Sequence, residues 1–440
     1  MLKKSSSRRL DVLMNGELVG HWTQLSGNRQ EFSYVDSWLQ SPNSRPLSLS
    51  MPLSLNNTVY KNDLVEPYFD NLLPDNLQIK ERLQSRVKAL STGAFDLLAE
   101  FGMDCVGAVQ LVSAESSHDN VRTIQATLLS EQAIEAELRS VTATPILGQQ
   151  QADFLRLSIA GAQEKTALLK QGSDWYRPSG STPTTHIIKL PMGKVGNEQA
   201  DLSTSVENEW LCSKIIAAFG VPIAQCDIAT FGAQKALVVE RFDRRLSKDK
   251  DWWVRIPQED LCQATATPSA FKYESDGGPG VKAINNLLLG SRTAREDVEN
   301  FIKAQILFWM LCAPDGHAKN FSIFIEKHGR YTMTPLYDVI SAYPIMGKGK
   351  HSIAENKIKM AMAMPGRNKH YHWAKVQPRH IEAVAAISGR KPAELIDELC
   401  DQTDIAIEAA AVLIPDDFPG EVADRIFSGM SKARDKLGRR

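Results

Sequence analysis

Apolar positions recur along the chain in two rhythms, and each rhythm predicts a kind of element. Alternation at every second position is typical of strands, and recurrence every three to four positions is typical of helices. In the first region, strand-like runs lie at 11–14, 17–20, 32–34 and 106–112, and helix-like runs lie at 67–83 and 93–100. Asn15-Gly16 favours a hairpin turn between the first two runs. Residues 1–112 are therefore predicted to form a small mixed α/β domain, and 113–150 a polar linker with one helix.

The next region, residues 151–245, has the pattern of a sheet with a helix packed on it. Its strand-like runs lie at 154–159, 166–170, 186–190 and 236–239. Between the first two runs, a loop of small residues covers 160–165. Small side chains let backbone N–H groups approach a phosphate closely. This loop is therefore either the cover of a nucleotide's phosphates or an ordinary hairpin.

Lys189 lies within the apolar run 186–190. Because lysine is rarely buried without a partner, it either binds phosphate there or points to water from an edge strand. An amphipathic helix is predicted at 204–219, and Glu207 and Glu209 near its start are candidate partners of Lys189. Acidic residues also favour a first helical turn through the helix dipole alone, so the sequence leaves the choice between them open.

The last region, residues 246–440, is mostly helical by its periodicity. The pair Thr293 and Glu296 has the form of a capping box and begins a helix that is predicted to reach Cys312. Further helix-like runs lie at 381–388, 392–401 and 404–413. A glycine-rich loop at 275–280 either gates a substrate or, as we expect, is a plain surface turn. The basic residues at both chain ends are expected to be solvated and disordered.

Composition narrows the class of protein. The 440 residues, 43% hydrophobic and 23% charged, suit a globular protein of two or three domains. No apolar run is long enough to cross a bilayer, and the N-terminus lacks the apolar core of a signal peptide. The six cysteines are scattered without a C-x-x-C pair, which argues against a zinc site or a disulfide framework. We therefore expect a cytoplasmic protein with no membrane partner.

The strongest chemical signal lies between Asp315 and Asp338. A polar loop from Asp315 to Asn320 precedes two short apolar runs that predict a hairpin, and Asp338 closes the stretch. Kinases need an Asp that accepts the substrate's hydroxyl proton, and an Asn and a second Asp that hold Mg²⁺ against the phosphates of ATP. In protein kinases the catalytic Asp precedes the metal-binding Asn by the spacing seen here. The alternative is a plain turn before a strand, because Asp and Asn are common in turns.

Positive charge gathers between Lys348 and His380. This stretch holds eight Lys and Arg against one acid, Glu355, so its net charge is +7 while that of the whole chain is −1. Such a patch suits contact with a phosphate backbone. A solvated loop or a docking surface for an acidic protein is equally consistent with it.

The chain resembles the HipA toxin kinases of bacterial type II toxin–antitoxin modules. The matching motifs are RPLSLS at 45–50, FDNLLPD at 69–75, FDLL at 95–98, VGAV at 106–109, SIAGAQEK at 158–165, TTHIIKLP at 184–191, ERFDRR at 240–245, KYESDGGPG at 272–280 and DGHAKNF at 315–321. The resemblance implies an α+β fold with two lobes, like that of eukaryotic protein kinases. Its mixed N-terminal lobe would include the nucleotide-binding part at 151–245, and 246–440 would form the mainly helical C-terminal lobe.

The resemblance also implies roles for particular residues. Asp315 would be the catalytic base, and Asn320 and Asp338 would hold Mg²⁺. The residues expected to contact ATP are Ile159, Ala160, Gly161, Ala162, Gln163, Glu164, Lys189, Glu240, Arg241, Phe242, Gln258, His317 and Tyr337. Ser158 would be an autophosphorylation site, and the added negative charge should eject the neighbouring loop from a cleft built for polyanions.

Partners follow from the same resemblance. The family pairs with a small helix-turn-helix antitoxin that binds operator DNA, and Arg379, Arg390 and Lys391 are candidates for direct DNA contact. The acceptor would be a protein hydroxyl, and glutamyl-tRNA synthetase is a candidate by analogy. No G-x-G-x-x-G motif occurs, Pro314-Asp315-Gly316 replaces His-Arg-Asp, and Tyr337-Asp338-Val339 replaces Asp-Phe-Gly. A kinase of small molecules or lipids, and a binding protein that represses through the basic patch, remain alternatives.

Overall fold

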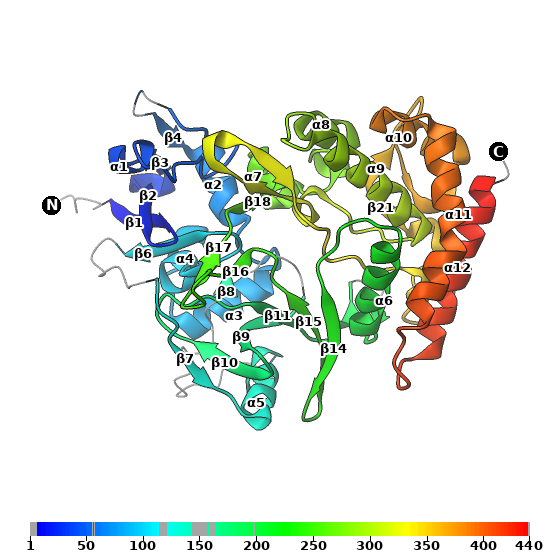
Figure 1. The fold of residues 1–440 in the computed structure, drawn as a ribbon, viewed down its shortest axis with the longest axis horizontal. Helices are drawn as coiled ribbons and strands as arrows, with labels where there is room; N and C mark the ends of the chain where they lie inside the picture. The colour runs from blue at the N-terminus through cyan, green and yellow to red at the C-terminus, as the bar shows by residue number, and fades with distance from the viewer. Residues whose placement is uncertain are drawn as a thin grey trace.

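The protein is described here by a computed structural model. It covers residues 7–54, 56, 58–113, 121–142, 157–158, 163–196 and 199–438. Two bodies lie side by side in Figure 1, with the sheets of the N-terminal half on one side and the helices of the C-terminal part on the other. None of the described helices is long and apolar enough to cross a membrane.

A five-stranded antiparallel sheet with helices packed on it forms the first domain. Its strands, in the order β4-β3-β2-β1-β6, are β1 Arg8–Met14, β2 Glu17–Gln24, β3 Gln30–Tyr34, β4 Val59–Lys61 and β6 Val109–Ser113. Its helices are α1 Asp36–Leu39, α2 Asn62–Asp70, α3 Leu77–Val87 and α4 Ala94–Phe101. Trp22 belongs to the buried hydrophobic cluster of this domain, and its ring stacks on that of Phe69 with the centroids 3.8 Å apart. The predicted hairpin is confirmed, because Asn15 and Gly16 have φ of 49° and 81°.

The single helix predicted over 67–83 is wrong. Two helices occupy this stretch, α2 and α3, and a turn separates them. The side chain of Asn76 starts α3 by accepting hydrogen bonds from the N–H groups of Gln78 and Ile79 at 2.8 and 3.3 Å. The basic residues Arg8 and Arg9 are also not a disordered tail, because they begin β1, where Arg8 pairs with Asp96 at 2.5 Å.

A six-stranded sheet follows, in the order β14-β15-β11-β9-β10-β7. Its strands are β7 Ala126–Leu128, β9 Lys165–Gln171, β10 Asp174–Pro178, β11 His186–Lys189, β14 Cys226–Phe231 and β15 Gln234–Glu240. The helix predicted in the linker is α5, Glu131–Thr142, and Ile134 and Leu138 pack it onto this sheet. Strand β11 lies between β9 and β15, so the edge-strand alternative for Lys189 is wrong.

The strand before the small-residue loop pairs differently from the prediction. Strand β8, Leu157–Ser158, runs parallel to β5, Asp104–Cys105, in the first domain. The hairpin alternative for the loop is therefore wrong, because β8 pairs with β5 whereas β9 pairs with β10 and β11, although β9 itself is confirmed. Residues 159–162 and the side chain of Ser158 lie outside the described residues.

The second body is mainly helical. Its helices are α6 Ser205–Ala218, α7 Leu261–Ala264, α8 Val281–Leu288, α9 Ala294–Met310, α10 Pro378–Ala385, α11 Pro392–Ala411 and α12 Gly420–Gly438. Short strands connect them, namely β12 Gly193–Val195, β13 Ala200–Leu202, β16 Arg244–Leu246, β17 Trp253–Arg255, β18 Gln258–Asp260, β19 Ser322–Ile325, β20 Tyr331–Met333, β21 Lys359–Met364 and β22 His370–His372. One buried cluster joins α6 to α9, α11 and α12, so the helix that packs on the six-stranded sheet is anchored in the second body (Figure 1).

Three predictions for this body are wrong. The helices predicted at 392–401 and 404–413 are the single helix α11. Three of the C-terminal basic residues, Lys432, Arg434 and Lys436, lie on α12, which buries Ile426 and Met430, and Arg439 and Arg440 lie outside the described residues. Thr293 precedes α9 as predicted, but its side chain makes no capping hydrogen bond. The nearby carboxylate of Asp297 accepts a hydrogen bond from the Met333 N–H at 2.9 Å.

A buried cluster of five charges joins the first domain to the segment after β15. Asp104 and Asp243 meet Arg241, Arg244 and Arg255 there, and all five residues are buried. Arg244 contacts each carboxylate at 2.9 Å. Burial by itself would raise the pKa of Asp104, but the three arginines lower it to about 2.

Gly107 lets the two parts of the chain approach. Its N–H donates to Asp243 at 2.7 Å, and its φ is +73°. A Cβ at this position would lie 2.5 Å from the carbonyl oxygen of Gln258. This explains physically why glycine stands here in the VGAV motif.

Candidate active site

The loop after α9 carries Asp315 and Asn320. The amide of Asn320 donates to the carbonyl oxygen of Asp315 at 2.8 Å, so a side-chain bond closes the loop. Gly316 lies against α9, and a Cβ there would lie 2.5 Å from the ring of Phe308. The loop is thus held against the helix by close packing, and its length places both polar side chains beside one cavity.

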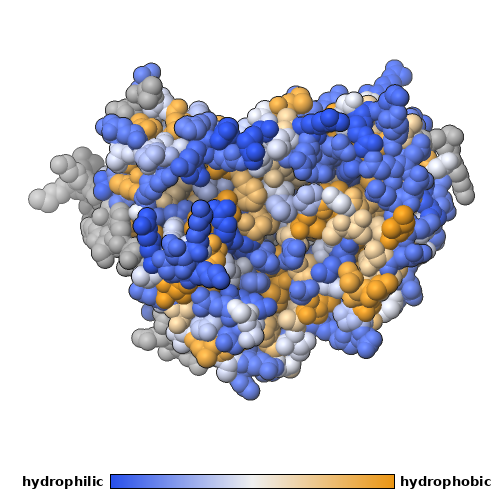
Figure 2. Space-filling model, in the orientation of Figure 1, coloured by the Kyte–Doolittle hydropathy of each residue, from blue (hydrophilic) through white to orange (hydrophobic). Residues whose placement is uncertain are grey.

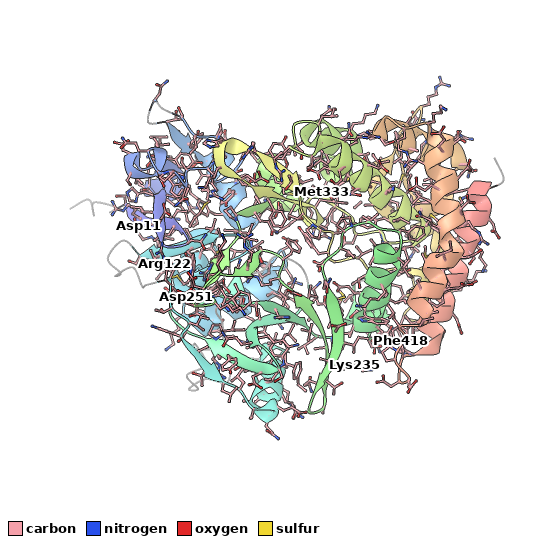
Figure 3. The ribbon with its side chains drawn as sticks, in the orientation of Figure 1. Asp11, Arg122, Lys235, Asp251, Met333 and Phe418 are labelled. Atoms are coloured by element: carbon pink, nitrogen blue, oxygen red, sulfur yellow. The ribbon has the colours of Figure 1, made fainter. Side chains whose placement is uncertain are left out.

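Lys189 bridges two carboxylates. Its Nζ donates to Glu209 at 2.6 Å and also contacts Asp338. Glu209 is therefore the acid that pairs with Lys189, whereas Glu207 pairs with Lys235 at 2.9 Å. Lys235 is labelled in Figure 3, where it lies close to Phe418, beside the second body. The sequence alone could not choose between the two acids, and the packing of α6 chooses.

Asp338 differs from the two residues that it meets. Lys189 and Glu209 are buried, whereas 28% of the Asp338 side chain is exposed. Its φ is 59°, in the left-handed region that residues other than glycine rarely adopt. Such strained positions gather at functional sites.

A cavity of about 640 Å³ brings the predicted residues together. Asp315, Asn320, Asp338 and Lys189 all line it. Apolar residues come to the surface along the boundary between the two bodies, with hydrophilic residues around them (Figure 2). The spatial arrangement expected from the spacing of Asp315, Asn320 and Asp338 is present. The chemical roles of these residues stay predictions.

One part of the cavity is suited to a flat aromatic ligand. The rings of Phe242 and Tyr337 lie 6.0 Å apart and tilted, and both side chains line the cavity. Gln258 also lines it, and its buried Oε1 has no hydrogen-bond partner among the described residues. A buried acceptor without a partner is rare and suggests a group that a ligand satisfies. These features fit a nucleobase.

Glu240 and Arg241 were also expected to contact ATP, and both line the cavity. Glu240 is exposed, and the guanidinium of Arg241 is fixed by Asp243 at 2.9 Å in the buried charge cluster. The N–H groups of Glu240 and Arg241 already donate to the carbonyl oxygens of Gln225 and Thr185, both at 2.9 Å. A base would therefore have to meet other backbone groups of this segment.

The described end of the small-residue loop is anchored. Gln163 donates to the carbonyl oxygen of Leu190 at 2.6 Å, and the carboxylate of Glu164 pairs with Arg82 of α3. Ile159, Ala160, Gly161 and Ala162 lie outside the described residues. Lys165 was given no role from the sequence, yet it stands directly across from Lys189 and lines the cavity. Burial, with the charge of Lys189, lowers the pKa of Lys165 to about 7.

His317 and Tyr337 are buried in the cavity wall. Burial lowers the pKa of His317 to about 4, so its approach to Asp315, 3.8 Å from Nε2 to Oδ1, is not an ion pair at neutral pH. The Tyr337 hydroxyl donates to the carbonyl oxygen of Lys319 at 3.1 Å. Its oxygen is therefore held in the wall of the cavity, and its ring packs beside Phe242.

The cavity residues that the sequence did not single out include Asp75, Lys272, Tyr273 and Lys319. Asp75 pairs with Lys319 at 2.5 Å and with Lys272 at 2.6 Å. The hydroxyl of Tyr273 donates to Oδ1 of Asp315 at 2.6 Å. Their motifs were visible in the sequence, but the contacts of Asp75 join segments about 200 residues or more apart, and periodicity does not reveal such contacts.

The positive stretch from Lys348 to His380 does not form one uniform surface. Lys357 and Lys359 line the cavity, and Lys369 pairs with Glu274 at 2.9 Å. Arg379 is exposed.

The other two candidates for DNA contact follow this stretch. Arg390 is bound by Glu299 at 2.8 Å and Glu398 at 2.7 Å, and Lys391 pairs with Glu394 at 2.8 Å. Arg390 is thus already neutralised, whereas Arg379 presents its charge to solvent.

The donors present fit Mg²⁺ bound together with a nucleotide. Among the described residues, no three His, Cys, Asp or Glu side chains gather as a metal site. Magnesium usually takes one or two protein ligands and completes its shell with phosphate oxygens and water. Asn320 and Asp338, which line the same cavity, supply that number.

Comparison with known proteins identifies the family. Family models match residues 10–112, as the HipA N-terminal domain, and residues 157–407, as the HipA-like C-terminal domain. The Sinorhizobium fredii protein Y4mE, whose name calls it a kinase, is 34% identical over 345 residues, covering 77% of this chain and 78% of its own. The serine/threonine-protein kinase toxin HipA of Shewanella oneidensis is 31% identical over 324 residues, covering 70% of this chain and 69% of its own.

The fold agrees with that family. The structure of Shewanella oneidensis MR-1 HipA with HipB and its operator DNA matches with a TM-score of 0.78 at 22% identity, covering 98% of this chain and 97% of that chain. The predicted α+β fold with its kinase-like lobes is thus confirmed. This chain belongs to the HipA family.

Proposed function

We propose that this protein is an ATP- and Mg²⁺-dependent serine/threonine kinase and the toxin of a toxin–antitoxin module. The observation that carries the proposal is the convergence of Asp315, Asn320, Asp338 and Lys189 on one cavity. The kinase and toxin names of the relatives support it. We place the protein in the cytoplasm, where ATP is available and where its six free cysteines would stay reduced.

The chain's own residues position the reactants. Asp315 accepts the proton of the acceptor hydroxyl while the hydroxyl oxygen attacks the γ-phosphorus of ATP. The bond between that phosphorus and the bridging oxygen breaks, and ADP leaves with that oxygen. Lys189, held by Glu209, presents its charge to the phosphates. Mg²⁺, held by Asn320 and Asp338, would neutralise the charge on the phosphate oxygens. Phe242, Tyr337 and Gln258 would bind the adenine.

Transfer of phosphate from labelled ATP, onto the protein itself and onto glutamyl-tRNA synthetase, tests this proposal. Asp315→Gln should reduce transfer about 10³-fold or more, because it removes the base. Asp276→Asn, at an exposed position in the nearby glycine-rich loop, is the matched control and should match the wild type. Equal transfer by wild type and Asp315→Gln would refute the proposed function. Transfer to a small alcohol in place of protein would favour a small-molecule kinase.

We further propose that phosphorylation of Ser158 inactivates the enzyme. Ser158 ends the strand that pairs with Cys105 of the first domain and precedes the small-residue loop. A phosphate there adds a charge of about −1.5 to −2 next to a site for polyanions. Ser158→Ala should still bind ATP but keep its activity after prolonged incubation with ATP. Equal loss of activity in the variant and the wild type would contradict this.

A helix-turn-helix antitoxin and its operator DNA are the proposed partners. The DNA complex of the Shewanella protein supports them for this chain. If the toxin touches DNA directly, Arg379→Ala should weaken binding to a preformed antitoxin–operator complex and reduce its salt dependence. Arg390→Ala, whose charge is already paired, is the control. An equal effect of both variants would locate the contact elsewhere.

A further inference from the structure

Tyr273 lies on the carboxylate of Asp315. Its hydroxyl donates to Oδ1 at 2.6 Å, and both residues line the cavity. A substrate hydroxyl that gives its proton to Asp315 must donate the same kind of hydrogen bond. A carboxylate has two oxygens that accept hydrogen bonds, so Tyr273 takes one and leaves Oδ2 for the substrate.

Two side chains flank the ring of Tyr273. The ring meets that of His317 edge to face, with centroids 5.0 Å apart. The Nζ of Lys272 lies 5.4 Å from the centroid of the Tyr273 ring. The hydroxyl is therefore held at Asp315 by contacts on the ring as well as by its hydrogen bond.

Backbone hydrogen bonds fix the segment that carries Tyr273. The Ala318 N–H donates to the carbonyl oxygen of Lys272 at 3.4 Å, and the Gly278 N–H donates to that of Tyr273 at 3.0 Å. A Cβ on Gly278 would lie 2.1 Å from the carbonyl oxygen of Phe271. The loop expected to be a plain surface turn is thus anchored to the catalytic loop, and close packing fixes its shape.

The first domain reaches this assembly through Asp75. Its carboxylate pairs with Lys272 at 2.6 Å and with Lys319 of the catalytic loop at 2.5 Å. Lys319 also donates to the carbonyl oxygen of Leu73 at 3.2 Å. Burial by itself would raise the pKa of Asp75, but Lys319 and Lys272 lower it to about 2. One ionised carboxylate of the first domain therefore joins the Tyr273 segment to the catalytic loop.

We propose that Tyr273 is a positioning residue for the base Asp315, and that Asp75 holds the two segments in register. Through Asp75, the first domain then helps to position the residues of the active site. This inference rests on the proposed function, because it needs Asp315 to act as the base.

Tyr273→Phe tests the first half, since it removes the hydroxyl and keeps the ring. It should lower kcat for phosphate transfer about 10- to 100-fold, because a misplaced base loses part of the rate that general-base catalysis contributes. KM for ATP should stay within about twofold of the wild-type value. Tyr331→Phe is the matched control, because it loses a hydroxyl bonded to the carbonyl oxygen of Leu287, and it should retain wild-type kcat. Thermal melting identifies any unfolding. An unchanged kcat, a raised kcat, or a loss that follows melting would overturn the role.

Asp75→Asn tests the second half and should lower kcat about tenfold at unchanged KM for ATP, because it weakens two ion pairs. Asp75→Glu, which keeps the charge, should recover part of the loss. Asp96→Asn is the control, since Asp96 pairs with Arg8 at 2.5 Å and accepts a hydrogen bond from Ser91, both within the first domain. Equal losses at Asp96 and Asp75 would overturn the role of Asp75. If the wild-type protein transfers no phosphate, the proposed function is overturned as well. If the wild type is active and Tyr273→Phe is equally active, the role of Tyr273 alone is overturned.

Discussion

Two clusters of opposite charges lie within this protein, and they are built differently. In the first, Asp104 and Asp243 are enclosed with three arginines, and all five side chains are buried. In the second, Lys189 bridges the buried Glu209 and the partly exposed Asp338. Asp338 faces the cavity, and its backbone has left-handed φ. The first cluster is also bonded to backbone carbonyl oxygens, such as that of Cys105 at 2.8 and 2.9 Å.

The difference separates a structural cluster from a chemical one. Charges taken fully out of water cost several kcal/mol each unless partners surround them, so the arginine cluster stabilises one arrangement of the two parts it joins. A carboxylate at a cavity wall keeps access to water and to ligands, so its charge stays available. Burial, more than the number of ion pairs, tells the two clusters apart.

The same substitution at both clusters gives the largest expected contrast. Asp104→Asn removes one of two negative charges among three arginines and should destabilise the fold by about 3–5 kcal/mol, the usual cost of breaking a buried pair. Urea denaturation measures it. Asp249→Asn, at an exposed position, is the control and should change stability by less than about 0.5 kcal/mol. A loss at Asp104 as small as that at Asp249 would refute the structural assignment.

Asp338→Asn should show the reverse pattern. Its partly exposed side chain keeps its size, so the free energy of unfolding should change by less than about 1 kcal/mol. Phosphate transfer should fall about 100-fold or more, because an anionic ligand for Mg²⁺ is lost. Kinetics of transfer at several Mg²⁺ concentrations check this. A stability loss as large as that of Asp104→Asn, without a kinetic effect, would place Asp338 among the structural charges.

Glu259 sharpens the comparison with a smaller effect. It is buried like Asp104, but burial without an arginine raises its pKa to about 8, despite a hydrogen bond from the Leu49 N–H at 2.8 Å. A carboxyl group with a raised pKa holds its proton in the folded state between about pH 4.5 and 8, whereas the unfolded chain has lost it. Stability therefore falls as pH rises through this window, by at most about 1.4 kcal/mol per pH unit.

Glu259→Gln should flatten that decline. Melting temperatures at pH 5 and pH 8 give the measurement, and wild type should lose more on going to pH 8 than the variant. Asp104 has the opposite sign, because its lowered pKa makes its contribution disappear only as pH falls from about 4 toward 2. Identical pH dependence in wild type and Glu259→Gln would show that Glu259 is ionised in the fold.

The sequence by itself determined the elements with clear periodicity and the residues with a recognisable spacing. The hairpin at Asn15-Gly16 and the spacing of Asp315 and Asn320 depend on neighbours in the chain, so local pattern was enough to predict them. Local pattern failed where a break or a cap was decided by packing, as in the turn between α2 and α3 and in the continuous helix α11.

Tertiary structure alone decided which charges meet. Glu207 and Glu209 lie about 200° apart around α6, so both suit a first helical turn but face different neighbours. Only the docking of α6 against the sheet directs Glu209 to Lys189 and Glu207 to Lys235. Asp75 reaches Lys319 across more than 200 residues of sequence, through the contact between the two parts of the molecule. Ion pairs carry no signature at such separations, because their energy depends on distance and burial in space.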